Sequence, residues 1–217
     1  PADPNTAEVK EMLQSIKADL FVLGGYGKIL KKNIINLPPK PPINLHAGRL
    51  PYFRGSSPLN WALIKGEDSF GLSILYVDGR IDRGDLLCER EFPIKEEDTI
   101  HDLHKKANQA FPEMLLEVLN NIKNGNQVAT PQDETKACYY PLRFPEDGRI
   151  FLDQITSEEL HNRIRALTKP YSGVYTYWQG KRIKLYAAEH FCGTFYGESG
   201  RIYRKHKDKI FSDFSIL

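Results

Sequence analysis

The order of segments near the start of the chain constrains the fold most. A helix capped by Asn5 or Thr6 is predicted because Val9, Met12 and Ile16 recur at the spacing of one helical face. Residues 20–23 form a short apolar run that predicts a buried strand, and a glycine-rich turn follows at residues 24–27. This order of helix, short strand and glycine turn is typical of an α/β sheet.

Further strands and helices are predicted downstream. The proline-rich stretch at residues 37–42 must be a loop, because proline has no amide donor, and it leads into a strand at residues 43–46. A third strand is predicted at residues 71–77. Helices are predicted to begin at Pro58, the residue after Ser57, and after Thr99.

The character of the sequence changes after about residue 130. Residues 156–159 have the form of a capping box, and aromatic and β-branched residues beyond residue 170 predict paired strands around a turn at Gln179 and Gly180. We therefore expect an α/β domain over residues 1–130, a linker over residues 131–150, and a small helix-plus-β domain over residues 151–217.

Composition excludes several classes of protein. Hydrophobic residues make up 41% of the 217 residues, which is enough for a buried core and excludes a disordered chain. A net charge of +2 argues against a protein that coats nucleic acid, and no apolar run is long enough to span a membrane. The odd cysteine count without a CxxC pair disfavours a zinc site and predicts reduced thiols and a cytoplasmic location.

Polar side chains gather at the ends of two predicted strands. Asn44 and His46 are two residues apart on one strand, so their side chains point to the same face of the sheet. The loop after the third strand carries three carboxylates, those of Asp78, Asp82 and Asp85. If the two strands are neighbours, one of these carboxylates can reach His46.

An amide, an imidazole and a carboxylate without a serine or cysteine nucleophile suit acyl transfer to an external amine. Asn44 would donate a hydrogen bond to the developing oxyanion, and His46 would stabilise that charge or carry a proton. The carboxylate would orient the imidazole. The alternative is structural, because such a pair on a strand is also typical of a hydrogen-bonded core.

Two motifs carry a resemblance to a known family. The run INLHAGRLPYFRGSSPLNWALIKGE begins at residue 43, and GLSILYVDGRIDRGDLL begins at residue 71. They resemble the formyltransferases that use 10-formyltetrahydrofolate, whose signature is N-L-H-x-x-x-L-P-x-x-x-G followed about 35 residues on by D-x-G-D/P. The resemblance covers roughly residues 20 to 190.

The resemblance implies a fold and a site. The fold would be a Rossmann-like α/β domain followed by a small OB-like domain, with the opening βα units of the family missing from this chain. Asn44, His46 and Asp82 would be the catalytic trio, because Asp82 directly precedes the x-Gly step of the motif. The co-substrate would be 10-formyltetrahydrofolate without a metal, and the residues expected at the folate are Tyr26, Gly27, Ile29, Asp78 and Gly79.

The resemblance also points to a substrate. Residues 139–150 and 164–173 resemble the linker and helix of the nucleotide-sugar N-formyltransferases. The acceptor would be an amino sugar on a nucleoside diphosphate, such as a dTDP-linked amino-dideoxyhexose used for lipopolysaccharide or another surface glycan. Its pyrophosphate would meet Lys28, Arg49 or Arg54, and its base would stack on Tyr171. No nucleic-acid or membrane partner is expected, and the family implies a homodimer.

Two alternatives stay open. Methionyl-tRNA formyltransferase performs the same chemistry on a macromolecule, and the five basic residues among residues 201–209 would suit contact with tRNA. A binding module that kept the scaffold and a folate or nucleotide site but lost turnover is the alternative from another class.

Overall fold

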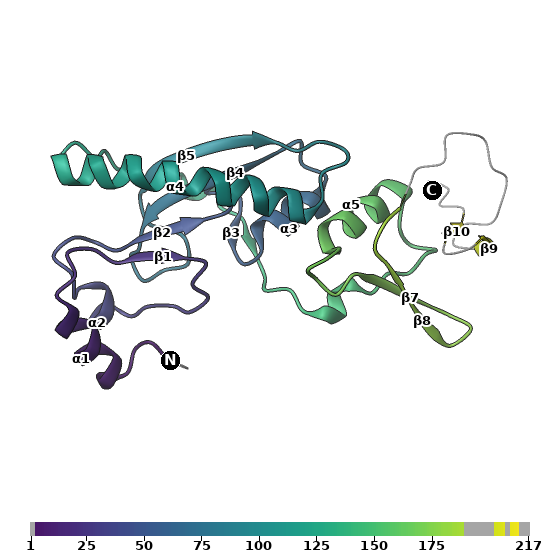
Figure 1. Cartoon of the computed structure of the whole chain (residues 1–217), viewed down its shortest axis with the longest axis horizontal. Helices are drawn as coiled ribbons and strands as arrows, with labels where there is room; N and C mark the ends of the chain where they lie inside the picture. Colours follow the sequence, from purple (N-terminus) through teal and green to yellow (C-terminus); the bar gives the residue numbers. More distant parts are fainter. Residues whose placement is uncertain (1–2, 189–201, 207–208, 213–217) are drawn as a thin grey trace. The chain divides into compact units, whose positions relative to one another are not determined.

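The computed structural model describes residues 3–188, 202–206 and 209–212 (Figure 1). The chain forms two compact units that are discontinuous in sequence. Unit 1 comprises residues 1–58, 69–93 and 105–142, and unit 2 comprises residues 59–68, 94–104 and 143–217. The contiguous domain boundaries at residues 130 and 150 stay a prediction.

Unit 1 contains a four-stranded sheet and the helices around it. The strands of this sheet are ordered β1-β2-β4-β5. The elements of unit 1 are α1 (Ala7–Ile16), β1 (Val22–Gly24), α2 (Lys32–Ile35), β2 (Ile43–His46), β3 (Arg54–Gly55), β4 (Ser69–Tyr76), β5 (Leu86–Pro93), α4 (Ile100–Asn124, which begins in unit 2), the 3-10 helix η1 (Glu134–Lys136) and β6 (Tyr139–Tyr140).

The sheet is mixed. β1 runs parallel to β2, with Leu23 opposite Asn44, whereas β4 runs antiparallel to both β2 and β5. The α/β class is therefore confirmed, and the second and third predicted strands are neighbours. β5 was not predicted, although its charged and apolar residues alternate with the period of a half-buried strand.

The predicted burial of the first strand is wrong. β1 lies at the edge of the sheet, and Val22 on it is 42% exposed. The preceding helix α1 is capped by Thr6 as predicted, but no residue of α1 is buried. An edge strand has a hydrogen-bonded neighbour on one side only, so apolar composition alone does not ensure burial.

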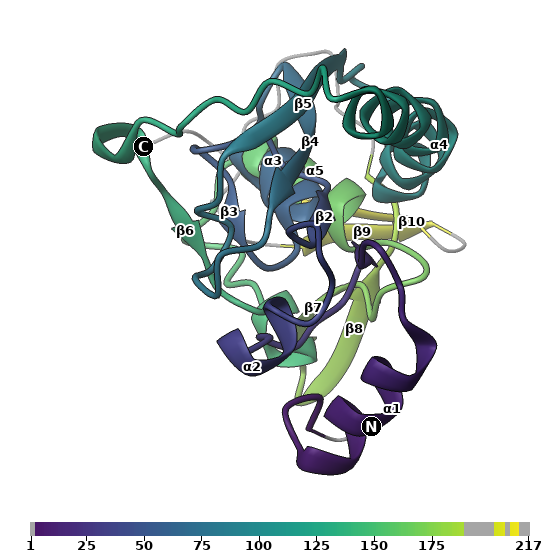
Figure 2. The same ribbon diagram turned by 90° about the vertical axis from the view of Figure 1, so that its left-hand side faces the viewer.

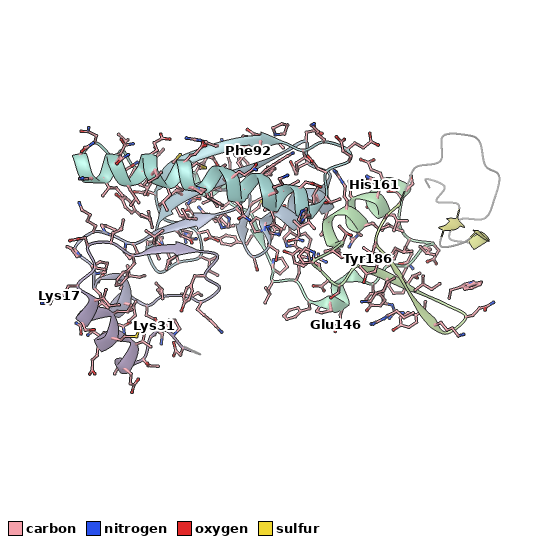
Figure 3. All side chains as sticks on the ribbon, in the orientation of Figure 1. Lys17, Lys31, Phe92, Glu146, His161 and Tyr186 are labelled. Atoms are coloured by element: carbon pink, nitrogen blue, oxygen red, sulfur yellow. The ribbon has the colours of Figure 1, made fainter. Side chains whose placement is uncertain are left out.

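One part of the core of unit 1 lies on the sheet, and a second part is the cluster of Leu30, Ile34 and Ile35 at α2. Ile43, Leu72 and Ile74 are fully buried, and each contributes about 2 kcal/mol of hydrophobic stabilisation. Phe70 and Phe92 stack across β4 and β5 with ring centroids 5.4 Å apart, and Figure 3 labels Phe92. Buried residues recur along one face of α4. Outside that face, Glu117 of α4 forms an ion pair with Arg90 of β5 at 2.8 Å.

Unit 2 is a smaller helix-plus-strand assembly. Asn60 Nδ2 donates to the carbonyl oxygen of Ala166 at 2.7 Å, which joins two of its helices. The elements here are α3 (Pro58–Lys65, with Pro58 itself in unit 1), the 3-10 helix η2 (Pro145–Gly148), α5 (Ser157–Leu167), β7 (Val174–Trp178), β8 (Lys181–Leu185), β9 (Ile202–His206) and β10 (Lys209–Ser212).

Short-range sequence patterns correctly predicted a helix start and a hairpin in unit 2. The capping box at the start of α5 is present, with Thr156 and Glu159 bonding reciprocally. β7 and β8 pair antiparallel around Gln179 and Gly180, both with positive φ, as in a two-residue hairpin turn. β9 and β10 form a second antiparallel pair, which includes part of the basic stretch 201–209. The OB-like form of this domain stays a prediction.

Across the described residues, none of the helices is both long enough and apolar enough to pass through a bilayer.

Candidate active site

The structure brings Asn44, His46 and Asp82 together. Asn44 and His46 project from β2 toward the same side, and Asp82 lies on the loop between β4 and β5. Asn44 Nδ2 donates to Asp82 Oδ1 at 3.4 Å, and His46 Nδ1 lies 3.6 Å from Asp82 Oδ2. Asp78 instead bonds Arg80, so Asp82 is the carboxylate of this loop that meets β2.

The position of Asp82 is fixed by a backbone amide. Gly55 donates its N–H to Asp82 Oδ2 at 2.9 Å. Gly55 lies on β3, which pairs in parallel with β6, as Figure 2 shows. Gly55 has φ +97°, and a Cβ there would lie 2.3 Å from the carbonyl oxygen of Tyr140, so only glycine fits. The N–H of Gly55 is thus held in place to receive the carboxylate.

His46 is buried, with 6% of its surface exposed. Its Nε2 lies 2.6 Å from the carbonyl oxygen of Phe53. A carbonyl oxygen only accepts, so this contact assigns a proton to Nε2. A proton on Nδ1 as well would give an imidazolium that faces the carboxylate of Asp82. The imidazole is therefore oriented by one oxygen on each side, that of Phe53 and that of Asp82.

Gly48 keeps the space that the imidazole needs. A Cβ on Gly48 would lie 2.7 Å from His46 Nε2 and 2.7 Å from the carbonyl oxygen of Phe53. Ser73 on β4 holds the loop, because its hydroxyl donates to the carbonyl oxygen of Gly48 at 2.7 Å. Glu89 accepts the N–H of Leu50 at 3.1 Å in the same loop. The loop between β2 and β3 is thus a shaped wall of the site.

The structure argues against the predicted pyrophosphate contact of Arg54. Its side chain is fully buried. All five of its N–H donors are used, with bonds to Gln132, Glu134 and the hydroxyl of Tyr139 at 2.8–3.1 Å. Burial lowers the pKa of Arg54, but the hydrogen bonds to Glu134 and Tyr139 outweigh burial and the net shift is upward. Arg54 is therefore a permanently charged structural residue.

Gln132 and Glu134 are residues of this region that sequence reasoning missed. Gln132 Nε2 donates to the backbone carbonyl oxygens of Asp82 at 2.9 Å and Gly84 at 2.7 Å. Glu134 pairs with Arg54 and also with Arg83 at 2.9 Å. They lie about fifty residues from the loop that they hold, and no local spacing signals such a contact.

Two segments predicted to bind the folate converge in the structure. The turn with Tyr26, Gly27 and Ile29 follows β1. Because β1 and β2 are parallel, this turn lies at the same end of the strands as His46, the last residue of β2. Tyr26 and Ile29 are exposed. The second segment contains Asp78 and Gly79. It lies close to the end of this turn, because a Cβ on Gly79 would be 3.9 Å from the carbonyl oxygen of Leu30.

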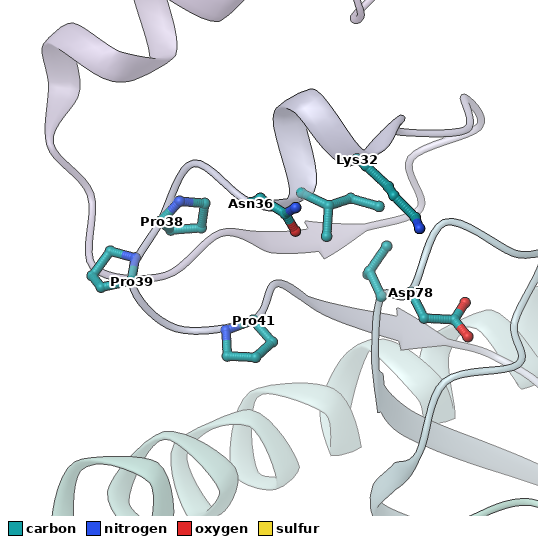
Figure 4. Close-up of a pocket in the computed structure, with 8 residues that line it drawn as sticks. Lys32, Asn36, Pro38, Pro39, Pro41 and Asp78 are labelled. Atoms are coloured by element: carbon teal, nitrogen blue, oxygen red, sulfur yellow. The ribbon is translucent and has the colours of Figure 1, made fainter.

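A hollow adjoins the second of these segments. Asp78 bonds Arg80, and although burial raises the pKa of Asp78, the hydrogen bonds from Arg80 outweigh it and the net shift is downward. The hollow measures about 500 Å³, and Figure 4 shows Asp78 and Lys32 on its wall. Its remaining lining residues are Ile35, Asn36, Pro38, Pro39, Pro41 and Val77.

The other residues predicted to bind the acceptor lie in different parts of the chain. Lys28 is exposed in the turn after β1. Arg49 pairs with Glu91 at 3.0 Å, and its guanidinium lies 4.9 Å from the ring centroid of Tyr52. Tyr171 belongs to unit 2, where its hydroxyl lies 3.1 Å from His104 Nε2. Their binding roles stay predictions. In the part of the chain that the structure describes, no group of three or more His, Cys, Asp or Glu residues could hold a metal.

Comparison with known proteins identifies two family models along the chain. The formyl transferase model matches residues 1–119, and the formyl transferase C-terminal domain model matches residues 144–211. Asn44, His46 and Asp82 all lie within the first match.

Two curated relatives are methionyl-tRNA formyltransferases. The methionyl-tRNA formyltransferase of Syntrophus aciditrophicus is 35% identical over 192 residues, 88% of this chain and 61% of that protein. That of Geobacter sulfurreducens is 34% identical over 212 residues, 97% of this chain and 65% of that protein. The chain thus spans less than two thirds of the length of these relatives.

Solved structures share the fold at lower identity. A 4-N formyltransferase from Francisella tularensis matches with TM-score 0.72 and 24% identity, covering 83% of this chain and 74% of that one. HypX from Aquifex aeolicus in complex with tetrahydrofolic acid gives 0.71 and 23%, covering 89% and 33%. An N-formyltransferase from Helicobacter canadensis, solved with folinic acid and dTDP-3-aminofucose, gives 0.61 and 21%, covering 73% and 58%. With a family model matched over more than half its length, the chain belongs to the formyl transferase family.

Proposed function

We propose that the protein transfers the formyl group of 10-formyltetrahydrofolate to the amine of a nucleotide-linked amino sugar. The observation that carries this proposal is the contact of Asn44 and His46 with one carboxylate, that of Asp82, on one side of the sheet. Membership of the formyl transferase family supports the reaction. The complex of HypX with tetrahydrofolic acid supports the co-substrate.

The reaction is a direct transfer between two nitrogens. The acceptor amine attacks the formyl carbon, a new C–N bond forms, and the bond from that carbon to the folate nitrogen breaks. One proton leaves the amine and one returns to the folate nitrogen. Asn44 supplies an amide whose second N–H can bind the oxyanion while the first faces Asp82.

His46 and Asp82 act as a pair in this scheme. A protonated His46 beside Asp82 would stabilise negative charge on the formyl oxygen. Proton transfer through Nε2 requires that its bond to the carbonyl oxygen of Phe53 be exchanged for one to the substrate. The amide of Gly55 keeps the carboxylate in place, so the charge on Asp82 is preorganised.

Two lines of support favour an amino sugar as the acceptor. The linker and helix sequences at residues 139–150 and 164–173 resemble those of the sugar enzymes. The Francisella and Helicobacter neighbours are named as a 4-N formyltransferase and as an N-formyltransferase solved with dTDP-3-aminofucose. Lys28 and Arg49 remain the proposed pyrophosphate contacts, with Tyr171 for the base; a role in surface glycan synthesis and a homodimer would follow.

A specific observation favours methionyl-tRNA as the second candidate acceptor. The hairpin of β7 and β8 carries Lys181, Arg182 and Lys184 beside aromatic rings, and the Arg182 guanidinium lies 5.2 Å from the ring centroid of Tyr175. Basic residues interleaved with aromatics suit contact with RNA. The curated relatives named above are methionyl-tRNA formyltransferases.

The test supplies the full-length protein with 10-formyltetrahydrofolate and one acceptor at a time. One reaction contains dTDP-4-amino-4,6-dideoxyglucose, the other methionyl-tRNA, and mass spectrometry follows the formyl group. Formylated sugar nucleotide with unmodified tRNA is the expected result. Formylated tRNA alone would replace the proposed acceptor and keep the chemistry. Tight folate binding with neither product would favour a binding module without turnover.

A further inference from the structure

The loop that carries Asp82 is held by a side chain outside the trio. Gln132 Nε2 donates to the carbonyl oxygens of Asp82 and Gly84 at 2.9 and 2.7 Å. The loop is closely packed at this point, because a Cβ on Gly84 would lie 1.8 Å from the carbonyl oxygen of Tyr76. The side-chain amide of Gln132 therefore hydrogen-bonds to the loop on both sides of Arg83.

The other end of the same amide is fixed by Arg54. Gln132 Oε1 accepts from Arg54 Nε at 3.1 Å and from a terminal nitrogen of the guanidinium at 2.8 Å. The remaining donors of Arg54 bond Glu134 and Tyr139, and its side chain is fully buried. Both the oxygen and the nitrogen of the Gln132 amide are thus saturated, and its orientation is unambiguous.

The grip matters because the backbone of Asp82 is unusual. Asp82 has φ +49°, a left-handed conformation that is uncommon for residues with a Cβ, although Asp adopts it more readily than most. The bond from Gln132 to its carbonyl and the bond from Gly55 to its carboxylate fix the residue at both ends. The direction of the carboxylate toward Asn44 and His46 follows from that backbone conformation.

We propose that Gln132 is a positioning residue for the active site, which acts by holding the left-handed backbone of Asp82 so that its carboxylate meets Asn44 and His46. The role in catalysis rests on the proposed function. The positioning itself does not, and it can be measured without any substrate.

The test variant is Gln132→Glu. Glutamate keeps an oxygen for the donors of Arg54, which protects folding, but it has no N–H for the two carbonyl oxygens. The matched control is Gln127→Glu in the same segment. Gln127 Nε2 also donates to two carbonyl oxygens, those of Leu87 and Val128, but not to the Asp82 loop.

The amide of Gly55 reports the position of Asp82, and the amides of its two neighbours serve as references. The N–H groups of Arg54 and Ser56 bond the backbone oxygens of Cys138 and Tyr140, whereas the N–H of Gly55 between them bonds the Asp82 carboxylate. In Gln132→Glu, amide hydrogen exchange at Gly55 should accelerate at least about tenfold while Arg54 and Ser56 keep wild-type rates. Gln127→Glu should leave all three unchanged.

Other patterns would overturn the proposal. Equal acceleration at all three amides would mean general loosening of β3 and β6, and no acceleration at Gly55 would mean that Gln132 does not position Asp82. Where the wild type transfers formyl, kcat of Gln132→Glu should fall by about tenfold or more with KM nearly unchanged, and an unchanged kcat would also overturn the role. If the wild type transfers none, the proposed function fails while the exchange result still decides the positioning.

Discussion

His46 and Asp82 face each other across 3.6 Å, with the opposite nitrogen of the imidazole held 2.6 Å from the carbonyl oxygen of Phe53. The ring is therefore fixed between a backbone acceptor and a carboxylate. Nε2 faces a carbonyl oxygen, so in this arrangement it serves as a hydrogen-bond donor. This geometry underlies the direct transfer that we propose.

Gly48→Ala should lower kcat by about tenfold or more and should also lower stability, because its Cβ would lie 2.7 Å from the backbone oxygen of Phe53. A methyl group there would lie 2.7 Å from His46 Nε2, so the imidazole must move away from its place beside Asp82. Steady-state rates and thermal melts of the variant measure both effects. Gly24→Ala is the control, because its methyl group would make an ordinary 3.7 Å contact with Leu45. Equal rates for Gly48→Ala and wild type would contradict the described site.

Arg54→Ala should destabilise the protein by about 3 kcal/mol, because it removes a buried side chain and leaves Gln132 and Glu134 without their partner. Urea denaturation measures the free energy of unfolding. Arg90→Ala removes an exposed pair with Glu117 and should change stability by less than about 1 kcal/mol. A loss of substrate affinity in Arg54→Ala without loss of stability would restore the pyrophosphate contact that the structure argues against.

His104 should make unit 2 less stable in mild acid. Burial lowers the pKa of His104 below its ordinary value of 6.5, and the nearby charge of His101 lowers it further. The unfolded chain then binds the proton more readily than the folded protein, so stability is full above 6.5 and falls as the pH drops through the lowered value.

The comparison for this effect is His104→Gln, which cannot be protonated. The variant should lose less stability than the wild type when the pH falls from neutral to mildly acidic, as measured by denaturation at a series of pH values. His101→Gln removes only the smaller cause and should have a smaller effect. The same pH dependence in His104→Gln and wild type would contradict the assignment.

Local and two-residue patterns made much of the fold predictable. The capping box of α5 and the hairpin turn at Gln179 and Gly180 are short-range devices, and both are present. The period of a strand placed Asn44 and His46 on one side. Spacing alone left Asp78, Asp82 and Asp85 open, and the family resemblance selected Asp82, the one that the structure places against β2.

The misread features depend on distant contacts. Arg54 was predicted to contact a pyrophosphate, but its partners are Gln132 and Glu134, which lie 78 and 80 residues away in sequence. β1 looked buried because its residues are apolar, yet its place at the sheet edge leaves Val22 exposed. Neither the partner of a charge nor the position of a strand in its sheet is encoded locally.

The central claim is that Asn44, His46 and Asp82 together promote formyl transfer to an amine. The most direct measurement is the single-turnover rate of Asn44→Ala, His46→Ala and Asp82→Ala with 10-formyltetrahydrofolate and the accepted amine. Each variant should keep the wild-type fold by circular dichroism and lose about 10²-fold or more in rate. Wild-type rates in all three variants would contradict the account.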